Sequence, residues 1–418
     1  MRQMKDSNIP WIGEIPINWK TMSNKYLMKK VKDINAIYNG EDILSLSMKG
    51  VHVRDLEAGG KMPSTFDGYQ NVYEGNLLMC LFDIDVTPRC IGLIKQDGIT
   101  SPAYSQFHME KIANSSYYYY YYLLLDYDKT LLHLSKNLRH SLTEEQLGSI
   151  KTLVPPIVEQ KRIADFLDRK CTEIDELISD LQEQIDTLDQ YRRSVITEAV
   201  THGLKSGLKT KNSGIVWMGY IPSHWRVIKT KYLFEIVKRI AGEEGYDVLS
   251  VTQQGLKVKD LDDYGGQIAE SYAGYQFVYP EDFVMNHMDL LTGWVDYSDK
   301  FGVTSPDYRV FRLIDKKANS LDYFKYVFQC CYLDKIYYSL GNGVAGVGRW
   351  RLQAHTFKNF RLPVPPLEEQ VAIAKYLDDK CSSITQYIDA NKQKISILQD
   401  YKKSIIYEYV TGKKEVPA

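Results

Sequence analysis

Three glycines in the second half of the chain have a spacing that could bind a nucleotide. Gly341, Gly343 and Gly346 match the pattern G-x-G-x-x-G of dinucleotide-binding loops. Such a loop must follow a strand and needs an acidic residue about 20 positions further on. Here Arg349-Trp-Arg351 and a proline segment follow. The segment is therefore read as an arginine-bearing loop that approaches a DNA backbone, or as a structural turn.

Two Pro-Pro sites are similar to the Asn-Pro-Pro-aromatic motif of adenine methyltransferases, in which the aromatic ring holds a flipped base. Val154 and Val364 stand where that motif has its Asn, and Ile157 and Leu367 replace the aromatic residue. The six cysteines lack metal-ligand spacing, the histidines are isolated, and no Walker lysine loop is present. The sequence therefore predicts no catalytic residue, no metal site and reduced structural thiols.

Two groups of hydroxyl-bearing residues each allow two interpretations. The six consecutive tyrosines Tyr117–Tyr122 could stack on bases, or could form a buried helix whose hydroxyls reach its rim. Thr100-Ser101-Pro102 and Thr304-Ser305-Pro306 could contact phosphates through hydroxyl and backbone N–H groups. A purely structural turn explains the Ser-Pro pairs equally well.

The chain contains one long internal repeat, in which the same motifs recur in the same order. The elements that position these residues are therefore expected to occur once in each half. The repeated pairs are Trp11–Trp19 and Trp217–Trp225, Gly68–Gln70 and Gly274–Gln276, Gly98–Tyr104 and Gly302–Tyr308, Pro155–Gln160 and Pro365–Gln370, Cys171 and Cys381, and Tyr191–Val195 and Tyr401–Ile405. A duplicated chain is expected to fold with a pseudo-twofold axis.

Each half ends in a long segment whose apolar residues recur at steps of three and four, a pattern typical of a coiled coil. Arg192, Asn391 and Lys402 interrupt the apolar seam. The expected seam consists of Leu167, Ile174, Ile178, Leu181, Ile185, Leu188, Leu377, Ile384, Ile388, Ile395 and Leu398. The two helices are predicted to pack antiparallel, each about 63 Å long at 1.5 Å per residue.

Composition is consistent with two large folded domains. The chain has 418 residues and 44% hydrophobic content. Its net charge of -1 counts against a DNA-binding surface that covers the whole protein, so any basic patch must be local. Neither a signal peptide nor an apolar stretch of about 18 residues is evident in the sequence, which predicts a cytoplasmic protein with no membrane contact.

The two halves together resemble the specificity subunits of type I restriction–modification systems. The resemblance covers essentially the whole chain. It rests on the Ser-x-Ile/Val-x-Trp-x-Gly-x-Ile-Pro-x-x-Trp start of each half, the Thr-Ser-Pro element and the Pro-Pro-(Ile/Leu)-x-Glu-Gln entry to each long helix. The first half departs from this pattern at Asn8-Ile9-Pro10, just before its Trp11.

This resemblance implies an α+β fold in which two pseudo-twofold-related, mixed α/β target-recognition domains are joined by two long antiparallel coiled-coil helices. The expected boundaries are 1–154 and 217–364 for the recognition domains, 155–203 and 365–412 for the helices, and 204–216 for a linker. Each recognition domain is expected to read one half of a bipartite double-stranded DNA target. The helices are expected to set the spacing between the half-sites.

The resemblance also implies a non-catalytic subunit that works through partners. Two methyltransferase subunits and two restriction/translocase subunits are expected, and S-adenosylmethionine, ATP and Mg are expected on those partners. The acid-rich face of the first long helix is read as a solvated surface, as a methyltransferase docking site, or as both. The DNA contacts predicted from loop position are Lys49, Arg54, Arg89, Ser101, Lys136, Arg139, Lys257, Lys259, Ser305, Arg309, Arg349 and Arg351.

Overall fold

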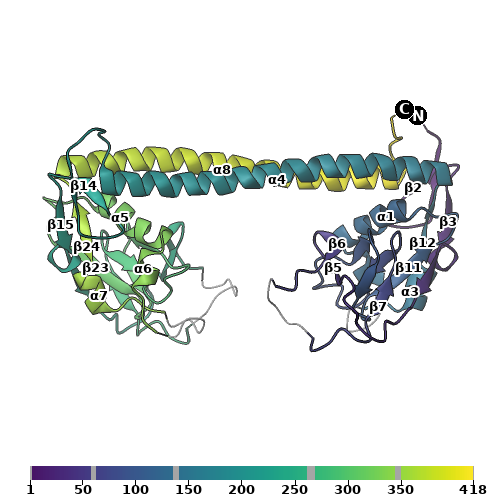
Figure 1. The fold of residues 1–418 in the computed structure, drawn as a ribbon, viewed down its shortest axis with the longest axis horizontal. Helices are drawn as coiled ribbons and strands as arrows, with labels where there is room; N and C mark the ends of the chain where they lie inside the picture. The colour runs from purple at the N-terminus through teal and green to yellow at the C-terminus, as the bar shows by residue number, and fades with distance from the viewer. Residues whose placement is uncertain (1, 58–62, 135–140, 261–268, 344–349, 418) are drawn as a thin grey trace. The chain divides into compact units, whose positions relative to one another are not determined.

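A computed structural model describes residues 2–57, 63–134, 141–260, 269–343 and 350–417. The chain divides into two compact units (Figure 1). Unit 1 comprises Met1–Leu181 and Lys392–Ala418, and unit 2 comprises Gln182–Asn391. Each unit therefore contains one recognition segment and part of each of the two long helices.

Unit 1 is built around a four-stranded antiparallel sheet with the strand order β4-β11-β8-β9. These strands are β4 (Met28–Val31), β11 (Ser105–Met109), β8 (Leu77–Met79) and β9 (Ile91–Leu93). Four two-stranded pairs surround the sheet: β1 (Met4–Asp6) with β2 (Glu14–Pro16), β3 (Lys20–Ser23) with β12 (Lys151–Val154), β5 (Leu44–Ser47) with β6 (Gly50–Val53), and β7 (Gln70–Val72) with β10 (Gly98–Thr100). Its shorter helices are η1 (Asn24–Tyr26), α1 (Ser115–Tyr127), α2 (Thr130–Leu134) and α3 (Glu144–Ser149).

Unit 2 repeats this topology element by element. Its central sheet has the order β16-β23-β20-β21, formed by β16 (Phe234–Val237), β23 (Arg309–Leu313), β20 (Phe283–Met285) and β21 (Val295–Tyr297). The strand pairs are β13 (Thr210–Asn212) with β14 (Tyr220–Pro222), β15 (Arg226–Lys229) with β24 (Arg361–Val364), β17 (Leu249–Thr252) with β18 (Gly255–Val258), and β19 (Gln276–Val278) with β22 (Gly302–Thr304). Its shorter helices are η2 (Thr230–Tyr232), α5 (Leu321–Leu333), α6 (Ile336–Ser339) and α7 (Ala354–Asn359).

The tyrosine run lies in the core of unit 1 as helix α1. Tyr117, Tyr118, Tyr121 and Tyr122 are at most 1% exposed, and burial raises the pKa of Tyr121 to about 12. Three hydroxyls donate to acceptors far away in the sequence: Tyr117 to Val410 O (2.8 Å), Tyr118 to Leu153 O (2.9 Å) and Tyr120 to Asp168 Oδ1 (2.7 Å). Tyr117 and Tyr120 thus bind the recognition segment to the long helices, and the buried rings are not a surface on which bases can stack.

The long helices are α4 (Ile157–His202) and α8 (Leu367–Val410), and in each unit a part of α4 lies beside a part of α8 (Figure 1). In unit 1 the rings of Phe166 and Tyr409 are 4.4 Å apart, and Lys402 pairs with Asp175 at 2.6 Å. The residue numbers rise along one helix as they fall along the other, so the two segments run antiparallel. The interruption of the seam at Lys402 is thus compensated by a carboxylate on the facing helix.

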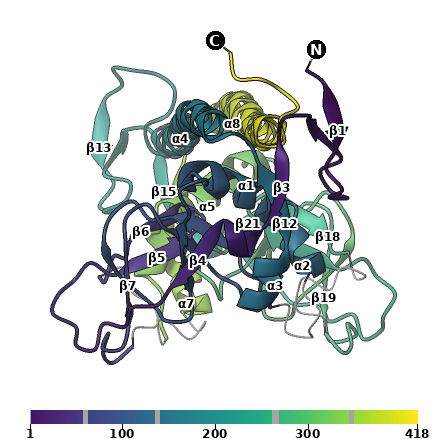
Figure 2. The same cartoon turned by 90° about the vertical axis from the view of Figure 1, so that its right-hand side faces the viewer.

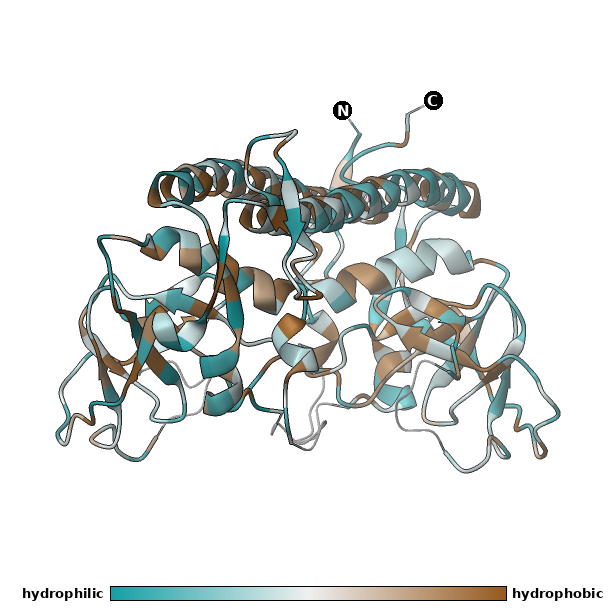
Figure 3. Ribbon diagram, turned by 60° about the vertical axis from the view of Figure 1, so that its left-hand side comes forward, coloured by the Kyte–Doolittle hydropathy of each residue, from teal (hydrophilic) through white to brown (hydrophobic). Residues whose placement is uncertain are grey.

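In unit 2 the same antiparallel arrangement holds. Asn391 Nδ2 donates to Gln184 Oε1 at 3.3 Å, so the seam's buried amide has a partner on the facing helix. Every predicted seam residue of both units is buried or half-buried. Apolar residues alternate with polar ones along both helices, as a helix with one buried stripe requires (Figure 3). The mixed α/β recognition domains and the pair of long antiparallel helices are confirmed, and the pseudo-twofold axis stays a prediction.

A glycine with positive φ follows each long helix, and at Gly412 it is also tightly packed. Gly412 has a φ of +72°, and a Cβ there would lie 2.6 Å from Pro16 Cδ and 2.9 Å from the Trp19 ring. Gly412→Ala is expected to destabilise unit 1 because it adds about 1–3 kcal/mol of overpacking to the backbone strain of about 1–2 kcal/mol.

Gly207 provides the matched control, because it has the same φ of +72° and a Cβ added there would meet no atom within 4 Å. Thermal unfolding of the purified chain should show a clearly larger fall in the melting temperature for Gly412→Ala than for Gly207→Ala. Equal shifts would contradict the packing argument.

Candidate nucleic-acid interface

The Pro-Pro-x-x-Glu-Gln motif that opens each long helix anchors the recognition segment. In unit 1, Glu159 accepts a hydrogen bond from Trp19 Nε1 at 3.0 Å, and Gln160 accepts one from the backbone N–H of Asn114 at 2.8 Å. In unit 2 the equivalent bonds join Trp225 to Glu369 (2.9 Å) and the Ser320 N–H to Gln370 (2.9 Å). The motif thus connects the start of each half, the main core helix and the long helix.

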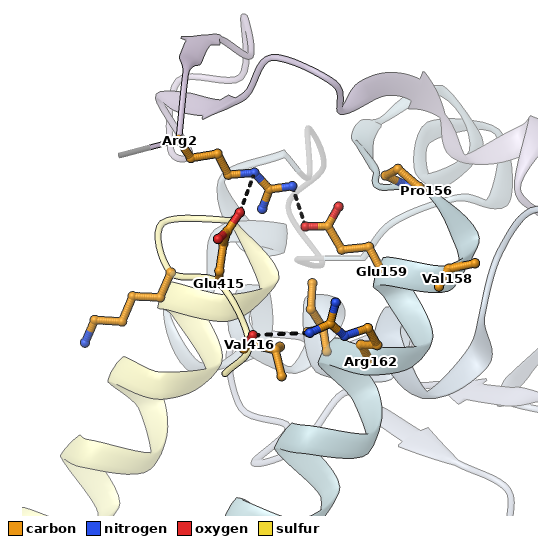
Figure 4. Close-up of a pocket in the computed structure, with 9 residues that line it drawn as sticks. Arg2, Pro156, Val158, Glu159, Arg162, Glu415 and Val416 are labelled. Atoms are coloured by element: carbon orange, nitrogen blue, oxygen red, sulfur yellow. Dashed lines mark hydrogen bonds and ion pairs between the residues drawn. The ribbon is translucent and has the colours of Figure 1, made fainter. Parts of the chain in front are cut away.

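Unit 1 has a cavity of about 310 Å³ at the start of α4 and the end of the chain (Figure 4). Arg2 reaches across it to Glu159 at 2.5 Å and to Glu415 at 3.5 Å, and Arg162 donates to the carbonyl of Val416. Both chain termini emerge on the helix side of unit 1 (Figure 2). Because Arg2 forms ion pairs with both glutamates, we interpret this cavity as part of a structural contact between residues near the two ends of the chain.

The predicted DNA contacts of unit 1 fall in two places. Lys49 is exposed in the turn between β5 and β6, and Arg54 follows β6. The positive charge of Arg54 favours a lower pKa for the Tyr104 hydroxyl, against the larger upward effect of burial. The backbone N–H of Tyr104 donates to the carbonyl of Ser101. The structure thus brings Arg54 and the Ser101 turn together. Arg89 lies elsewhere, half-buried beside the hydroxyl of Tyr119 at 3.5 Å, while Lys136 and Arg139 lie outside the described residues.

The Thr-Ser-Pro elements each form a turn that hydrogen bonds hold in place. Thr100 Oγ1 donates to Leu44 O at 2.7 Å, and Thr304 Oγ1 donates to Leu249 O at 2.8 Å. Ser101 and Ser305 each accept a hydrogen bond at 3.3 Å from the backbone N–H two residues on. These bonds fix a turn beside each hairpin. A phosphate contact by either serine stays a prediction.

In unit 2 the structure separates the predicted contacts. Lys257 is exposed on β18 and bonds to Gln254, and Lys259 follows at the end of the same hairpin, half-buried. Arg351 is half-buried, and its backbone pairs with Asn342. Arg349 lies outside the described residues, as does Gly346 of the glycine pattern. Gly341 and Gly343 follow helix α6 and not a strand, so the context of a dinucleotide-binding loop is not met.

The expected surface position of Arg309 is wrong, because the structure buries its side chain. Its side chain is 6% exposed, donates to Leu352 O at 2.8 Å and lies over the ring of Phe357 at 4.8 Å. Burial lowers the pKa of Arg309 to about 10. A contact between Arg309 and DNA stays a prediction.

Sequence reasoning missed two groups of side chains near these positions. In unit 1, Phe82 stacks on Tyr104 with ring centroids 6.2 Å apart, and Phe82 is 37% exposed. In unit 2, His287 lies beside the two arginines. Burial and then the positive charges of Arg309 and Arg351 lower its pKa to about 4. Only the repeat of Tyr104 as Tyr308 in the Thr-Ser-Pro-x-Tyr motif pointed to the first group.

Two kinds of site find no support within the residues that the structure describes. No three His, Cys, Asp or Glu side chains gather where they could hold a metal ion. No helix in this part of the chain has the length and apolar character that crossing a membrane requires.

Comparison with known proteins identifies the family. The model of the type I restriction modification DNA specificity domain matches residues 93–187 and 222–404. The putative type I restriction enzyme MjaX specificity subunit of Methanocaldococcus jannaschii is 24% identical over 286 residues, which are 65% of this chain and 61% of the relative. The type I restriction enzyme MjaVIII specificity subunit of the same organism is 25% identical over 282 residues, 63% of this chain and 62% of the relative. The chain thus spans about three fifths of the length of these curated relatives.

A solved structure shows the same fold. A chain from a structure described as "Structural basis underlying complex assembly and conformational transition of the type I R-M system" superposes with a TM-score of 0.66, at 12% identity. The superposition covers 96% of this chain and 99% of that chain. At this identity the likeness speaks for the fold alone. The family model matches segments of both halves, and on that ground the chain belongs to the family of type I restriction–modification DNA specificity domains.

Proposed function

We propose that this chain is the DNA sequence-specificity subunit of a type I restriction–modification complex. Each recognition segment reads one half of a bipartite double-stranded target, and the long helices set the spacing between the halves. The family match in both halves of the chain carries this proposal. The repeated topology supports it, since two copies of one scaffold with different surface residues suit two different half-sites.

We further propose that the subunit is not itself an enzyme. Val154 and Val364 stand where a methyltransferase motif has its Asn, and Ile157 and Leu367 stand where it has its aromatic residue. The glutamates and glutamines that follow are used in packing: Glu159 and Glu369 hold tryptophans, and Gln160 and Gln370 hold the core helices. Burial raises the pKa of Cys80 and of Cys381, which disfavours reactive thiolates. Methyl transfer, ATP-driven translocation and the associated S-adenosylmethionine, ATP and Mg then belong to partner subunits in the cytoplasm.

The test is methyl transfer from labelled S-adenosylmethionine to a DNA library by the purified chain, by its methyltransferase, and by both together. We expect incorporation at one split target only when both are present. Incorporation by the chain alone would contradict the non-catalytic assignment. Incorporation by the methyltransferase alone at the same target would contradict the specificity role.

Exposed apolar residues on the long helices support docking of two methyltransferase subunits. Leu177 and Tyr401 in unit 1 are each 52% exposed, and their repeat equivalents in unit 2, Tyr387 and Tyr191, are 67% and 50% exposed. Each unit therefore presents one such residue from α4 and one from α8. Two equivalent surfaces predict two copies of the same partner, and two restriction/translocase subunits are proposed to join the complex.

Substitution of these residues should change the number of bound partners. Leu177→Ala with Tyr401→Ala is expected to leave one methyltransferase bound, and adding Tyr191→Ala and Tyr387→Ala should remove both, because each surface loses its apolar contact area. Native mass spectrometry counts the subunits. Val86→Ala with Leu291→Ala, exposed apolar residues of the recognition segments, serves as control and should retain two. Two methyltransferases on the fourfold variant would contradict this assignment of the docking surface.

A further inference from the structure

Unit 2 contains a cluster of three cationic or titratable side chains that the fold alone does not explain. The backbone of Leu352 joins them: its N–H donates to His287 O at 3.0 Å, and its carbonyl accepts from Arg309 Nη2 at 2.8 Å. Arg351 immediately precedes Leu352 in the chain. The positive charges of Arg309 and Arg351 both lower the pKa of His287, after the larger effect of burial. In the sequence, His287 follows β20, Arg309 begins β23, and Arg351 precedes helix α7.

No carboxylate forms an ion pair with Arg309 or Arg351 in the part of the chain that the structure describes. Arg309 Nη1 is buried and has no hydrogen-bond partner among the described residues. The titratable groups whose charge affects the pKa of Arg309 are the phenols Tyr332 and Tyr337. Both phenols are neutral at physiological pH, and burial raises the pKa of each still further. Among the residues that the structure describes, the Arg351 side chain likewise forms no hydrogen bond or ion pair. A buried cation is ordinarily paired, so this arrangement is suited to an anion supplied from outside.

The equivalent place in unit 1 has the same backbone and different side chains. In the central sheet of unit 1, Ser105 of β11 lies opposite Met79 of β8. In unit 2, Arg309 of β23 lies opposite Met285 of β20 in the same way. The Leu142 N–H donates to Leu81 O at 2.8 Å, as the Leu352 N–H donates to His287 O. Unit 1 therefore places Leu81, Ser105 and Ser141 where unit 2 has His287, Arg309 and Arg351. Because the scaffold forms in unit 1 without these three side chains, their presence in unit 2 points to a ligand that unit 2 alone meets there.

We propose that His287, Arg309 and Arg351 form an anion site in unit 2 that takes one phosphate group of the DNA backbone. Arg351 is the contact residue, because it is half-buried and its guanidinium is unpaired among the described residues. Arg309 is a positioning residue that holds the Arg351-Leu352 segment through the Leu352 carbonyl. A phosphate fits better than a base edge, because a phosphate has a full negative charge and accepts the paired N–H groups of a guanidinium. This inference rests on the proposed function.

The experiment measures the affinity of the complex of this chain and its methyltransferase for duplexes that contain its methylated target. Phosphates around the half-site read by unit 2 are replaced one at a time by neutral methylphosphonate. For the native complex, one replacement should weaken binding markedly. Arg351→Ala should bind the unmodified duplex roughly tenfold more weakly, lower the salt dependence by about one phosphate contact, and lose no further affinity at that one replaced position.

Variants of two other arginines separate positioning from general charge. Arg309→Lys keeps the charge but replaces the guanidinium fork by a single ammonium group, so it should weaken the coupling between Arg351 and the replaced phosphate while the methylated sequence stays the same. Arg361→Ala removes an exposed arginine of the same unit, on β24, and should leave the coupling intact.

The outcomes distinguish this inference from the function on which it rests. If Arg351→Ala binds with native affinity and salt dependence, or loses the same affinity at every replaced phosphate, the phosphate site is wrong while the specificity role stands. If Arg351→Ala changes the methylated sequence, the contact is to a base and not to a phosphate. If the native complex shows no preference for its target over a scrambled duplex, the proposed function fails and this inference fails with it.

Discussion

A chain in which residues 11–154 also replace residues 217–364 is expected to recognise a target with the first half-site present twice. The second half-site of the native target should disappear from the methylated motif. Two mismatched base pairs already cost about 2–6 kcal/mol, so affinity for the native target should fall by roughly 30-fold to 10⁴-fold. Methylome sequencing of a host that expresses the variant with its methyltransferase reads the new motif directly.

The exchange is physically reasonable because the contacts between recognition segment and helices repeat in both units. Trp19 bonds to Glu159 as Trp225 bonds to Glu369. Two further bonds have counterparts: Tyr117 to Val410 O matches Tyr323 to Val200 O, and Tyr120 to Asp168 matches Tyr326 to Asp378. A copied segment therefore finds the same acceptors at its new place.

The reciprocal chain, with residues 217–364 also in place of 11–154, is the matched control. It should double the other half-site. If either exchange altered both half-sites, or left the native motif unchanged, the recognition segments would not be independent readers. That result would contradict the modular account of the two units.

Removal of one heptad from each long helix is expected to shorten the unread spacer and leave both half-sites intact. The heptads are 180–186 in α4 and 390–396 in α8, which contain the Gln184–Asn391 contact. Seven residues correspond to about 10.5 Å of helix, or about 3 base pairs at 3.4 Å each. Loss of a whole heptad keeps the remaining seam residues in register.

Binding to a set of duplexes that differ only in spacer length measures this effect. The maximum should move to a spacer about 3 base pairs shorter. A chain in which the two heptads are exchanged between the helices keeps the length and the Gln–Asn pair, so its maximum should not move. An unchanged optimum in the deletion variant would reject the view that helix length sets the spacing.

The long helices were largely predictable because their signal is local. The steps of three and four, the Pro-Pro entry and the glycine at the end lie within a single segment. The partners of the polar interruptions were not predictable: Asp175 faces Lys402 and Gln184 faces Asn391 only because the helices pack antiparallel in a particular register. The repeat was equally visible in the sequence, and it determined the order of elements in both units.

The surface residues were harder to predict, since exposure depends on contacts between segments distant in the sequence. The sequence suggests a loop position for Arg309, but this residue begins β23 opposite Met285 and is covered by Phe357. His287 gave no sequence signal, because the two arginines that affect its pKa follow it by more than twenty positions. The tyrosine run allowed two interpretations, and only the acceptors Val410, Leu153 and Asp168 decide for burial.

The most direct test of the central claim is genome-wide adenine methylation in a host that expresses this chain with its neighbouring methyltransferase, compared with a deletion of this gene alone. The account predicts that the deletion removes one split motif, consisting of two short blocks separated by a fixed unread gap, and no other. An unchanged methylation pattern, with the chain expressed and bound to its methyltransferase, would contradict the proposal that this chain specifies the target.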